Sequence, residues 1–104
     1  MTNYVLAYTG GGMASTDAER EAAMAAWGAW FGSLGSAIVD AGNPFGPSMT
    51  VASGGAVSEG GNSELTGYTV VQAEDLASAG ELAKGCPVLS NGGTVEVYET
   101  FSVM

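Results

Sequence analysis

The feature that most constrains this chain is a stretch of 18 residues, Ala22 to Val39, that carries no charge. A stretch of that length is just long enough to span a bilayer, so it forms either a membrane span or a buried helix. On a helix, its bulky apolar residues fall on one stripe at spacings of three and four. The stripe contains Ala23, Met24, Trp27, Trp30, Phe31, Leu34 and Ile38. Because the stripe is one-sided and neither flank carries a basic cluster, the pattern predicts a helix packed on a core.

The opposite side of this helix carries small residues where charged ones are usual. They are Ala22, Ala25, Ala29, Gly32, Ser33 and Ser36. Small residues at spacings of three and four let another backbone approach closely. One prediction is that this side packs against a helix of a neighbouring subunit and builds an assembly larger than a dimer. The alternative is an alanine-rich surface without a partner.

The rest of the chain divides into short strands and one further helix. In chain order we first expect a strand over 4–8, ended by glycines 10–12, and then the long helix from a capping box at 16–19 to about 41. A strand over 49–53 follows, and after it a glycine-rich hairpin tip or loop over 54–62 with a short strand at 56–58. The last three elements are a strand over 68–73, a helix over about 74–84 and a strand over 94–103. This order is the split βαβ arrangement of ferredoxin-like α+β domains. With 104 residues, 46% of them apolar, the chain is expected to form one domain, 1–104.

The first strand has apolar side chains on both of its faces, and the strand at 68–73 shares this feature. Both faces of such a strand are normally covered. A single layer of helices covers only one of them. We therefore predict a homodimer in which the sheets of two subunits pack face to face.

Composition excludes several classes of function. Eleven acidic and two basic residues give a net charge of -9, which repels the phosphates of nucleic acids and of anionic membranes. The chain has no histidine, the commonest general base and metal ligand, and we predict neither a metal nor a cofactor. One cysteine, Cys86, permits no internal disulfide, and the start Met1-Thr2-Asn3 lacks the charge of a signal peptide. A cytoplasmic protein is the expectation.

Short segments along nearly the whole chain form a recognisable set. They are Tyr4-Val5-Leu6-Ala7-Tyr8, the helix with Trp27, Trp30, Phe31 and Leu34, Leu65-Thr66-Gly67-Tyr68-Thr69-Val70-Val71, Glu74-Asp75-Leu76, Leu82-Ala83-Lys84-Gly85-Cys86-Pro87 and Gly93-Thr94-Val95-Glu96-Val97. Together these segments resemble the YCII-related family, including its DGPF branch. The resemblance implies a dimeric α+β barrel, in which two sheets face each other.

The resemblance also points to two acidic residues. Where the DGPF branch carries Asp-Gly-Pro-Phe before an acidic residue, this chain has Gly55-Ala56-Val57-Ser58 before Glu59, which places Glu59 in the candidate ligand pocket. In the wider family, a histidine in the first helix pairs with an aspartate at the end of that helix. Asp40 matches the aspartate, but the chain has no histidine to complete the pair.

Asp40 and four aromatic residues are the remaining candidates for a site. Asp40 is expected in the last turn of the long helix, where a negative charge opposes the helix dipole. It is either a general base or a solvated helix end. The aromatic residues either line an apolar pocket or fill the core, and they are Tyr8, Trp27, Trp30 and Tyr68.

Three functions are compatible with these residues. We expect a YCII-like domain that binds a small molecule, with no reaction assigned because the family histidine is absent. The first alternative is a small lyase or hydrolase that uses Asp40 as a general base. The second is a purely structural or interaction subunit.

Overall fold

A computed structural model of the protein describes residues 1–11, 15–61 and 63–103. Gly12 of the expected glycine turn and Asn62 of the expected glycine-rich segment lie outside these ranges. In chain order the elements are β1 (Thr2–Thr9), α1 (Asp17–Leu34), a 3₁₀ helix (Gly35–Ala37), β2 (Ile38–Asp40), β3 (Met49–Val51), β4 (Val57–Glu59), β5 (Leu65–Ala73), α2 (Leu76–Ala83), a second 3₁₀ helix (Pro87–Asn91) and β6 (Thr94–Glu99).

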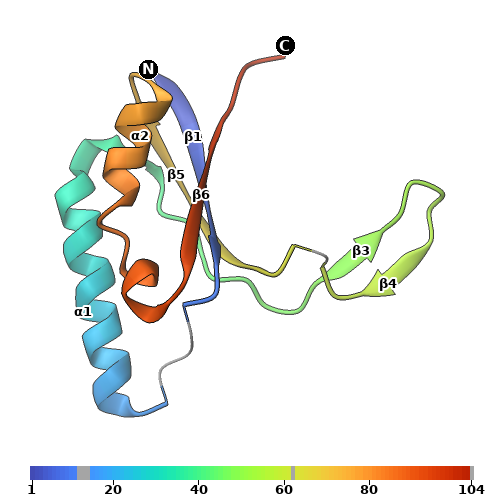
Figure 1. Ribbon diagram of the computed structural model, residues 1–104, viewed down its shortest axis with the longest axis horizontal. Helices are drawn as coiled ribbons and strands as arrows, with labels where there is room; N and C mark the ends of the chain where they lie inside the picture. The colour runs from blue at the N-terminus through green and yellow to red at the C-terminus, as the bar shows by residue number, and fades with distance from the viewer. Residues whose placement is uncertain (12–14, 62, 104) are drawn as a thin grey trace.

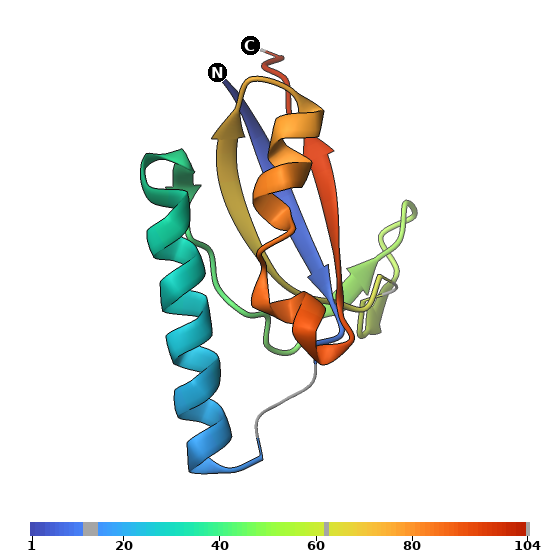
Figure 2. The same ribbon diagram turned by 60° about the vertical axis from the view of Figure 1, so that its left-hand side comes forward.

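Four strands form an antiparallel sheet in the order β2-β5-β1-β6. The long central strands β1 and β5 pair along their length, with Tyr4 opposite Val71 and Leu6 opposite Thr69. Both helices lie on the same side of this sheet (Figures 1 and 2). The protein is therefore a small α+β protein, and its strand order is compatible with the predicted ferredoxin-like fold.

The hydrophobic core lies between the helices and the sheet. Tyr4, Leu6 and Tyr8 of β1 point into it, and each is at most 5% exposed. The other buried members of this cluster are Trp30, Leu34, Val71, Ala73, Ala79, Ala83, Cys86 and Val88. Alternation along the strand therefore directs the intervening residues, Val5 and Ala7, to the opposite face of the sheet.

The start of α1 confirms the predicted cap. The Thr16 hydroxyl accepts a hydrogen bond from the Glu19 backbone N–H at 3.1 Å. The Glu19 carboxylate accepts from the Ser15 N–H at 2.9 Å, one residue earlier than the predicted capping box requires. The core stripe is confirmed at Trp30 and Leu34, which are buried, but Met24 is 75% exposed, so its predicted place in the core is wrong.

The end of α1 differs from the prediction. The helix ends at Leu34, because Gly35 adopts φ 54° and its N–H bonds to the Phe31 carbonyl. The chain then enters β2 instead of continuing as helix to residue 41. Asp40 is accordingly the last residue of a strand and not part of a helical turn. The expected terminator Gly42 does adopt a positive φ of 75°, but it does so in the turn after β2.

The side of α1 that carries small residues is exposed to solvent in the single chain. At Gly28 and Gly32 an added Cβ would meet no atom within 4 Å. Association through this side of α1 stays a prediction. No helix among the described residues combines the length and the apolar character needed to cross a membrane.

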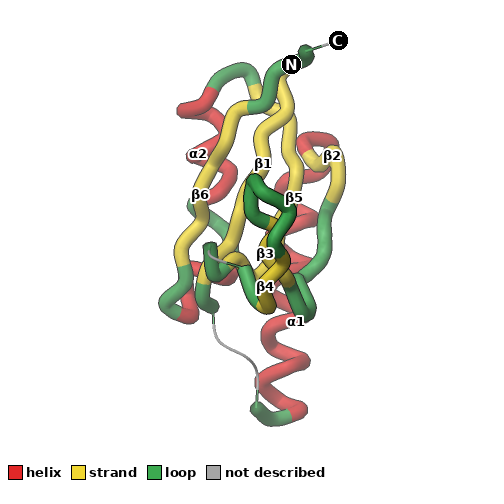
Figure 3. The backbone as a smooth tube through the Cα atoms, turned by 90° about the vertical axis from the view of Figure 1, so that its right-hand side faces the viewer, coloured by secondary structure: helices red, strands yellow, loops and turns green. Residues whose placement is uncertain are grey.

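The strand expected at 49–53 does not join the main sheet. β3 and β4 form a separate two-stranded hairpin, with Thr50 opposite Ser58. The short strand expected at 56–58 is confirmed one residue later. We call residues 48–60 the arm. Figures 1 and 3 show that the arm projects from the side of the sheet opposite the helices.

The last strand is shorter than expected. β6 ends at Glu99, and Phe101 and Val103, which the expected strand over 94–103 includes, are 80% and 79% exposed. Within β6, Val95 and Val97 are partly buried and pack on the core. The wrong part is therefore the extension beyond Glu99, although the Thr100 N–H and hydroxyl both donate to the Asn3 carbonyl of β1.

Candidate functional site

The side of the main sheet without helices forms one continuous face. Register places Ala7 beside Tyr68 and Glu96, and it places Val5 beside Val70 and Tyr98. We call these six residues the helix-free face. Tyr98 is 53% exposed there, and its hydroxyl donates to the Glu96 carboxylate at 2.6 Å. The face is apolar along β1 and β5 and acidic toward β6.

Asp40 and Tyr68 meet at the edge of this face. The Tyr68 hydroxyl donates to Asp40 Oδ2 at 3.3 Å, and the Gly42 backbone N–H donates to Asp40 Oδ1 at 2.9 Å. β2 brings Asp40 here because it pairs with β5, with Asp40 opposite Val70. The charge of Asp40 raises the pKa of Tyr68, and the hydrogen bond adds to this effect. The phenol is therefore protonated and oriented by the carboxylate at neutral pH.

Phe45 continues the site toward the arm. Its ring stacks on the Tyr68 ring with 5.7 Å between centroids and 20° between planes. The Phe45 N–H donates to the Thr66 carbonyl at 2.9 Å, and Pro44 forms a bridge with Gly67. These backbone contacts attach the base of the arm to the start of β5.

A hollow of about 590 Å³ lies between Phe45 and the arm. Its apolar lining includes Phe45, Pro47, Met49, Val51 and Leu65, and Glu64 contributes a carboxylate. A volume of this size is typical of small-molecule sites. Because Phe45 contacts both Tyr68 and the hollow, the hollow and the Asp40–Tyr68 pair form one candidate site.

The structure separates the predicted aromatic residues into two groups. Tyr8, Trp27 and Trp30 lie on the helix side of the sheet, with 5.4 Å between the Tyr8 and Trp27 rings and 5.7 Å between the Trp27 and Trp30 rings. Tyr68 lies on the opposite side. The sheet backbone therefore stands between the three core aromatics and the Asp40–Tyr68 pair.

The polar atoms of Tyr8 and Trp30 are satisfied inside the fold. The Tyr8 hydroxyl donates to Thr69 Oγ1 at 2.5 Å, and Thr69 in turn donates to the Ala41 carbonyl at 2.8 Å. Trp30 Nε1 donates to the Leu82 carbonyl at 3.0 Å. Burial raises the pKa of Tyr8 far above its ordinary value. These contacts give Tyr8 and Trp30 a structural role.

Glu59, the remaining candidate from the sequence, and Cys86, the single cysteine, both lie apart from the Asp40–Tyr68 pair. Glu59 is exposed on β4, opposite Met49, and does not contact Asp40 or Tyr68 through any hydrogen bond described for the chain. Cys86 is 2% exposed, and burial raises the pKa of its thiol. A buried thiol with a raised pKa is a packing group and not a nucleophile.

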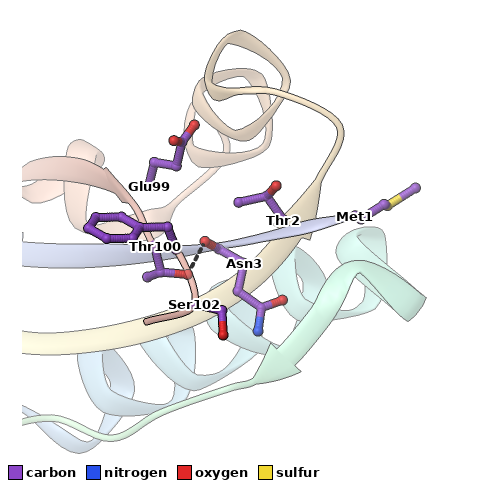
Figure 4. Close-up of a pocket in the computed structure, with 7 residues that line it drawn as sticks. Met1, Thr2, Asn3, Glu99, Thr100 and Ser102 are labelled. Atoms are coloured by element: carbon purple, nitrogen blue, oxygen red, sulfur yellow. Dashed lines mark hydrogen bonds between the residues drawn. The ribbon is translucent and has the colours of Figure 1, made fainter. Parts of the chain in front are cut away.

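A second hollow, of about 580 Å³, lies at the end of the sheet that carries both chain ends (Figure 4). Some of its polar groups are engaged within the fold. The Thr100 hydroxyl donates to the Asn3 carbonyl at 2.7 Å, and Glu99 accepts from the Tyr4 hydroxyl at 3.4 Å. This hollow therefore leaves fewer of its own polar groups for a ligand to bind.

Sequence reasoning missed Phe45 and the hollow beside it. The stiff segment Asn43-Pro44-Phe45-Gly46-Pro47 was available as a signal, because two prolines around an aromatic residue hold that ring in a fixed place. Among the described residues, no group of three or more His, Cys, Asp or Glu side chains is placed to hold a metal ion.

Comparison with known proteins gives no match: no protein-family model, curated protein or solved structure is significantly similar to this chain.

Proposed function

We propose that this chain is a YCII-like subunit that binds a small molecule beside Asp40 and Tyr68, within a homodimer formed through the helix-free face. The observation that carries the proposal is the Asp40–Tyr68 pair, which adjoins an apolar hollow on the one side of the sheet that no helix covers. The segments that resemble the YCII-related family support it from the sequence.

The helix-free face supports the homodimer. Val5, Ala7 and Val70 form an apolar centre to this face, and sheets packed face to face need such a centre. Val39 of β2, which neighbours this centre, is 49% exposed in the single chain. In the proposed dimer a second sheet covers these side chains and excludes water from the Asp40–Tyr68 pair.

The charge and shape of the site define the ligand class. The net charge of -9 and the carboxylates of Asp40 and Glu64 disfavour an anion. Phe45, Met49 and Leu65 favour an apolar or aromatic body in the hollow. The ligand is therefore a small aromatic or aliphatic molecule that is neutral or cationic and donates a hydrogen bond to Asp40.

An enzyme that uses Asp40 as a general base is the second candidate. The observation in its favour is that the Tyr68 hydroxyl already donates to Asp40, so a carboxylate and a proton donor stand together beside Phe45, which lines the hollow. This candidate shares its binding site with the first and differs from it in turnover.

Matched aromatic probes test the ligand class. We expect phenethylamine, a cation, to shift the amide NMR signals of Asp40, Gly42 and Phe45, and phenylpropionate, an anion of similar size, to shift them much less. The Asp40→Asn variant should lose most of the response to phenethylamine. The matched control is Glu21→Gln, which removes the same charge from the exposed surface of α1.

Equal responses to the two probes, or an unchanged response in Asp40→Asn, would overturn the proposed site. Consumption of a bound compound by the wild type but not by Asp40→Asn, with both variants equally folded by circular dichroism, would favour the enzyme.

A further inference from the structure

One face of the arm is mostly apolar and is exposed in the single chain. In an antiparallel pair, residues opposite each other point to the same side, so Met49, Val51 and Val57 share one face. Glu59, opposite Met49, is the one charged residue of β3 and β4 on this face. Their exposed fractions are 66%, 62% and 62%. The other face carries Thr50 and Ser58, which are polar. The arm is thus an amphipathic hairpin with its apolar face in solvent.

A hairpin of this kind is poorly stable alone. β3 and β4 have three residues each and pair only with each other. Isolated two-stranded hairpins are marginal in water and need a further apolar surface to pack on. The base of the arm is attached to β5 through Pro44 and Phe45, which leaves the hairpin extended away from its own sheet (Figure 1).

The surface area of the chain indicates how large the partner that covers the arm is. The chain exposes 6998 Å², whereas a compact monomer of 10.4 kDa exposes about 5,400 Å². The excess of about 1,600 Å² falls within the range of about 1,000 to 2,500 Å² that one subunit of a permanent homodimer buries. The radius of gyration, 15.2 Å, also exceeds the roughly 13 Å of a compact domain of this length. A second copy of this chain is therefore a partner of the right size.

The arm and the helix-free face lie on the same side of the molecule (Figures 1 and 3). A two-fold axis through that side brings the arm of each subunit to the sheet of the other, because a symmetric interface uses the same surface twice. We propose that the Met49, Val51 and Val57 face of the arm packs on the helix-free side of a second copy and so closes the hollow beside Phe45. This inference rests on the proposed sheet-to-sheet homodimer and adds the arm as its second contact.

Two variants of the arm test the contact. Val57→Glu places a charge on the apolar face, and Ser58→Glu places the same charge one residue along, on the polar face. In sedimentation equilibrium we expect Val57→Glu to raise the dimer dissociation constant at least tenfold and Ser58→Glu to change it less than twofold. Replacement of residues 48–60 by two glycines should weaken the dimer as much as Val57→Glu, which covers the case in which Val57→Glu only unfolds the hairpin.

The outcomes separate this inference from the proposed function. A wild-type dimer whose dissociation constant is unchanged by Val57→Glu and by loss of the arm would overturn the arm contact and leave the sheet dimer standing. A monomeric wild type would overturn both. Circular dichroism and thermal denaturation of each variant confirm that the main sheet remains folded.

Discussion

At the scale of the residue, Gly42 positions Asp40 in the candidate site. It adopts a φ of 75°, and its N–H donates to Asp40. A Cβ at this position would overlap the carbonyl oxygen of Tyr68. Only glycine therefore lets the turn after β2 lie against β5, and this close approach brings Asp40 within reach of the Tyr68 hydroxyl.

We expect Gly42→Ala to lower the free energy of unfolding by about 2 to 4 kcal/mol, from left-handed backbone strain together with overlap with Tyr68. Urea denaturation followed by circular dichroism measures the change. Gly32→Ala is the matched control, because its Cβ meets open space on a helix, and it should stabilise the protein by up to about 1 kcal/mol. Equal stabilities of the two variants would contradict this account of the turn.

At the scale of the element, the start of α2 depends on a charged cap. Asp75 Oδ1 accepts from the Ser78 N–H at 2.8 Å, and the hydrogen bond to Ser78 lowers the pKa of Asp75 below its ordinary value. A carboxylate with a lowered pKa in the folded state stabilises the fold at pH values above its unfolded pKa. That stabilisation is lost as the pH falls through the folded pKa.

We expect Asp75→Ser to keep the cap through its hydroxyl but to lose less stability than the wild type between about pH 5 and about pH 2. Asp75→Ala should be less stable than Asp75→Ser at neutral pH, because it has no acceptor for the Ser78 N–H. Urea titrations at several pH values measure both effects. An identical acid response in the wild type and Asp75→Ser would show that the carboxylate is not responsible.

The sequence predicts some elements better than others, because some depend on neighbouring residues and others on distant contacts. The caps of α1 and α2 are local, since a side chain three residues from an N–H decides them. The sequence predicts the Thr16 cap of α1, but it places Asp75 inside the second helix, where the structure makes it the cap of α2. The end of α1 depends on which glycine, Gly35 or Gly42, adopts a positive φ at the end of the helix, and in the structure it is Gly35. β2 has three residues, and only its pairing with β5 makes it a strand.

The candidate site was predictable only as separate residues. Asp40 and Tyr68 were both candidates, but their contact depends on the register that sets Asp40 opposite Val70, and no sequence pattern reveals that register. In the sequence, Tyr8 and Trp27 are aromatic candidates for the pocket just as Tyr68 is. Strand parity, which follows from the observed pairing of Ala7 with Tyr68, is what places Tyr68 on the other side of the sheet.

At the scale of the whole molecule, charge opposes the association that the apolar surfaces favour. Each copy carries -9, with Glu96 on the helix-free face and Asp40 at its edge. Two such surfaces repel each other across water, and added salt screens this repulsion. The proposed dimer should therefore tighten as ionic strength rises, the opposite of a protein that binds nucleic acid.

We expect the dimer dissociation constant to fall several-fold between about 10 mM and about 100 mM NaCl, because the Debye length shortens from about 30 Å to about 10 Å. Sedimentation equilibrium at each salt concentration measures it. Glu96→Gln should reduce the salt dependence, whereas Glu21→Gln on α1 should leave it nearly unchanged. A dimer that weakens with salt would show that attractive charge pairs, and not apolar contact, hold the subunits together.

The placement of the tryptophans has a practical consequence. Trp27 and Trp30 both belong to α1 and pack on the helix side of the sheet. The aromatic residues of the helix-free face are tyrosines. Tryptophan emission responds to water around the indole, so its spectrum follows the undocking of α1 from the core. Separation of two subunits leaves those indoles undisturbed. Intrinsic fluorescence therefore distinguishes loss of the fold from loss of the partner in a single unlabelled sample.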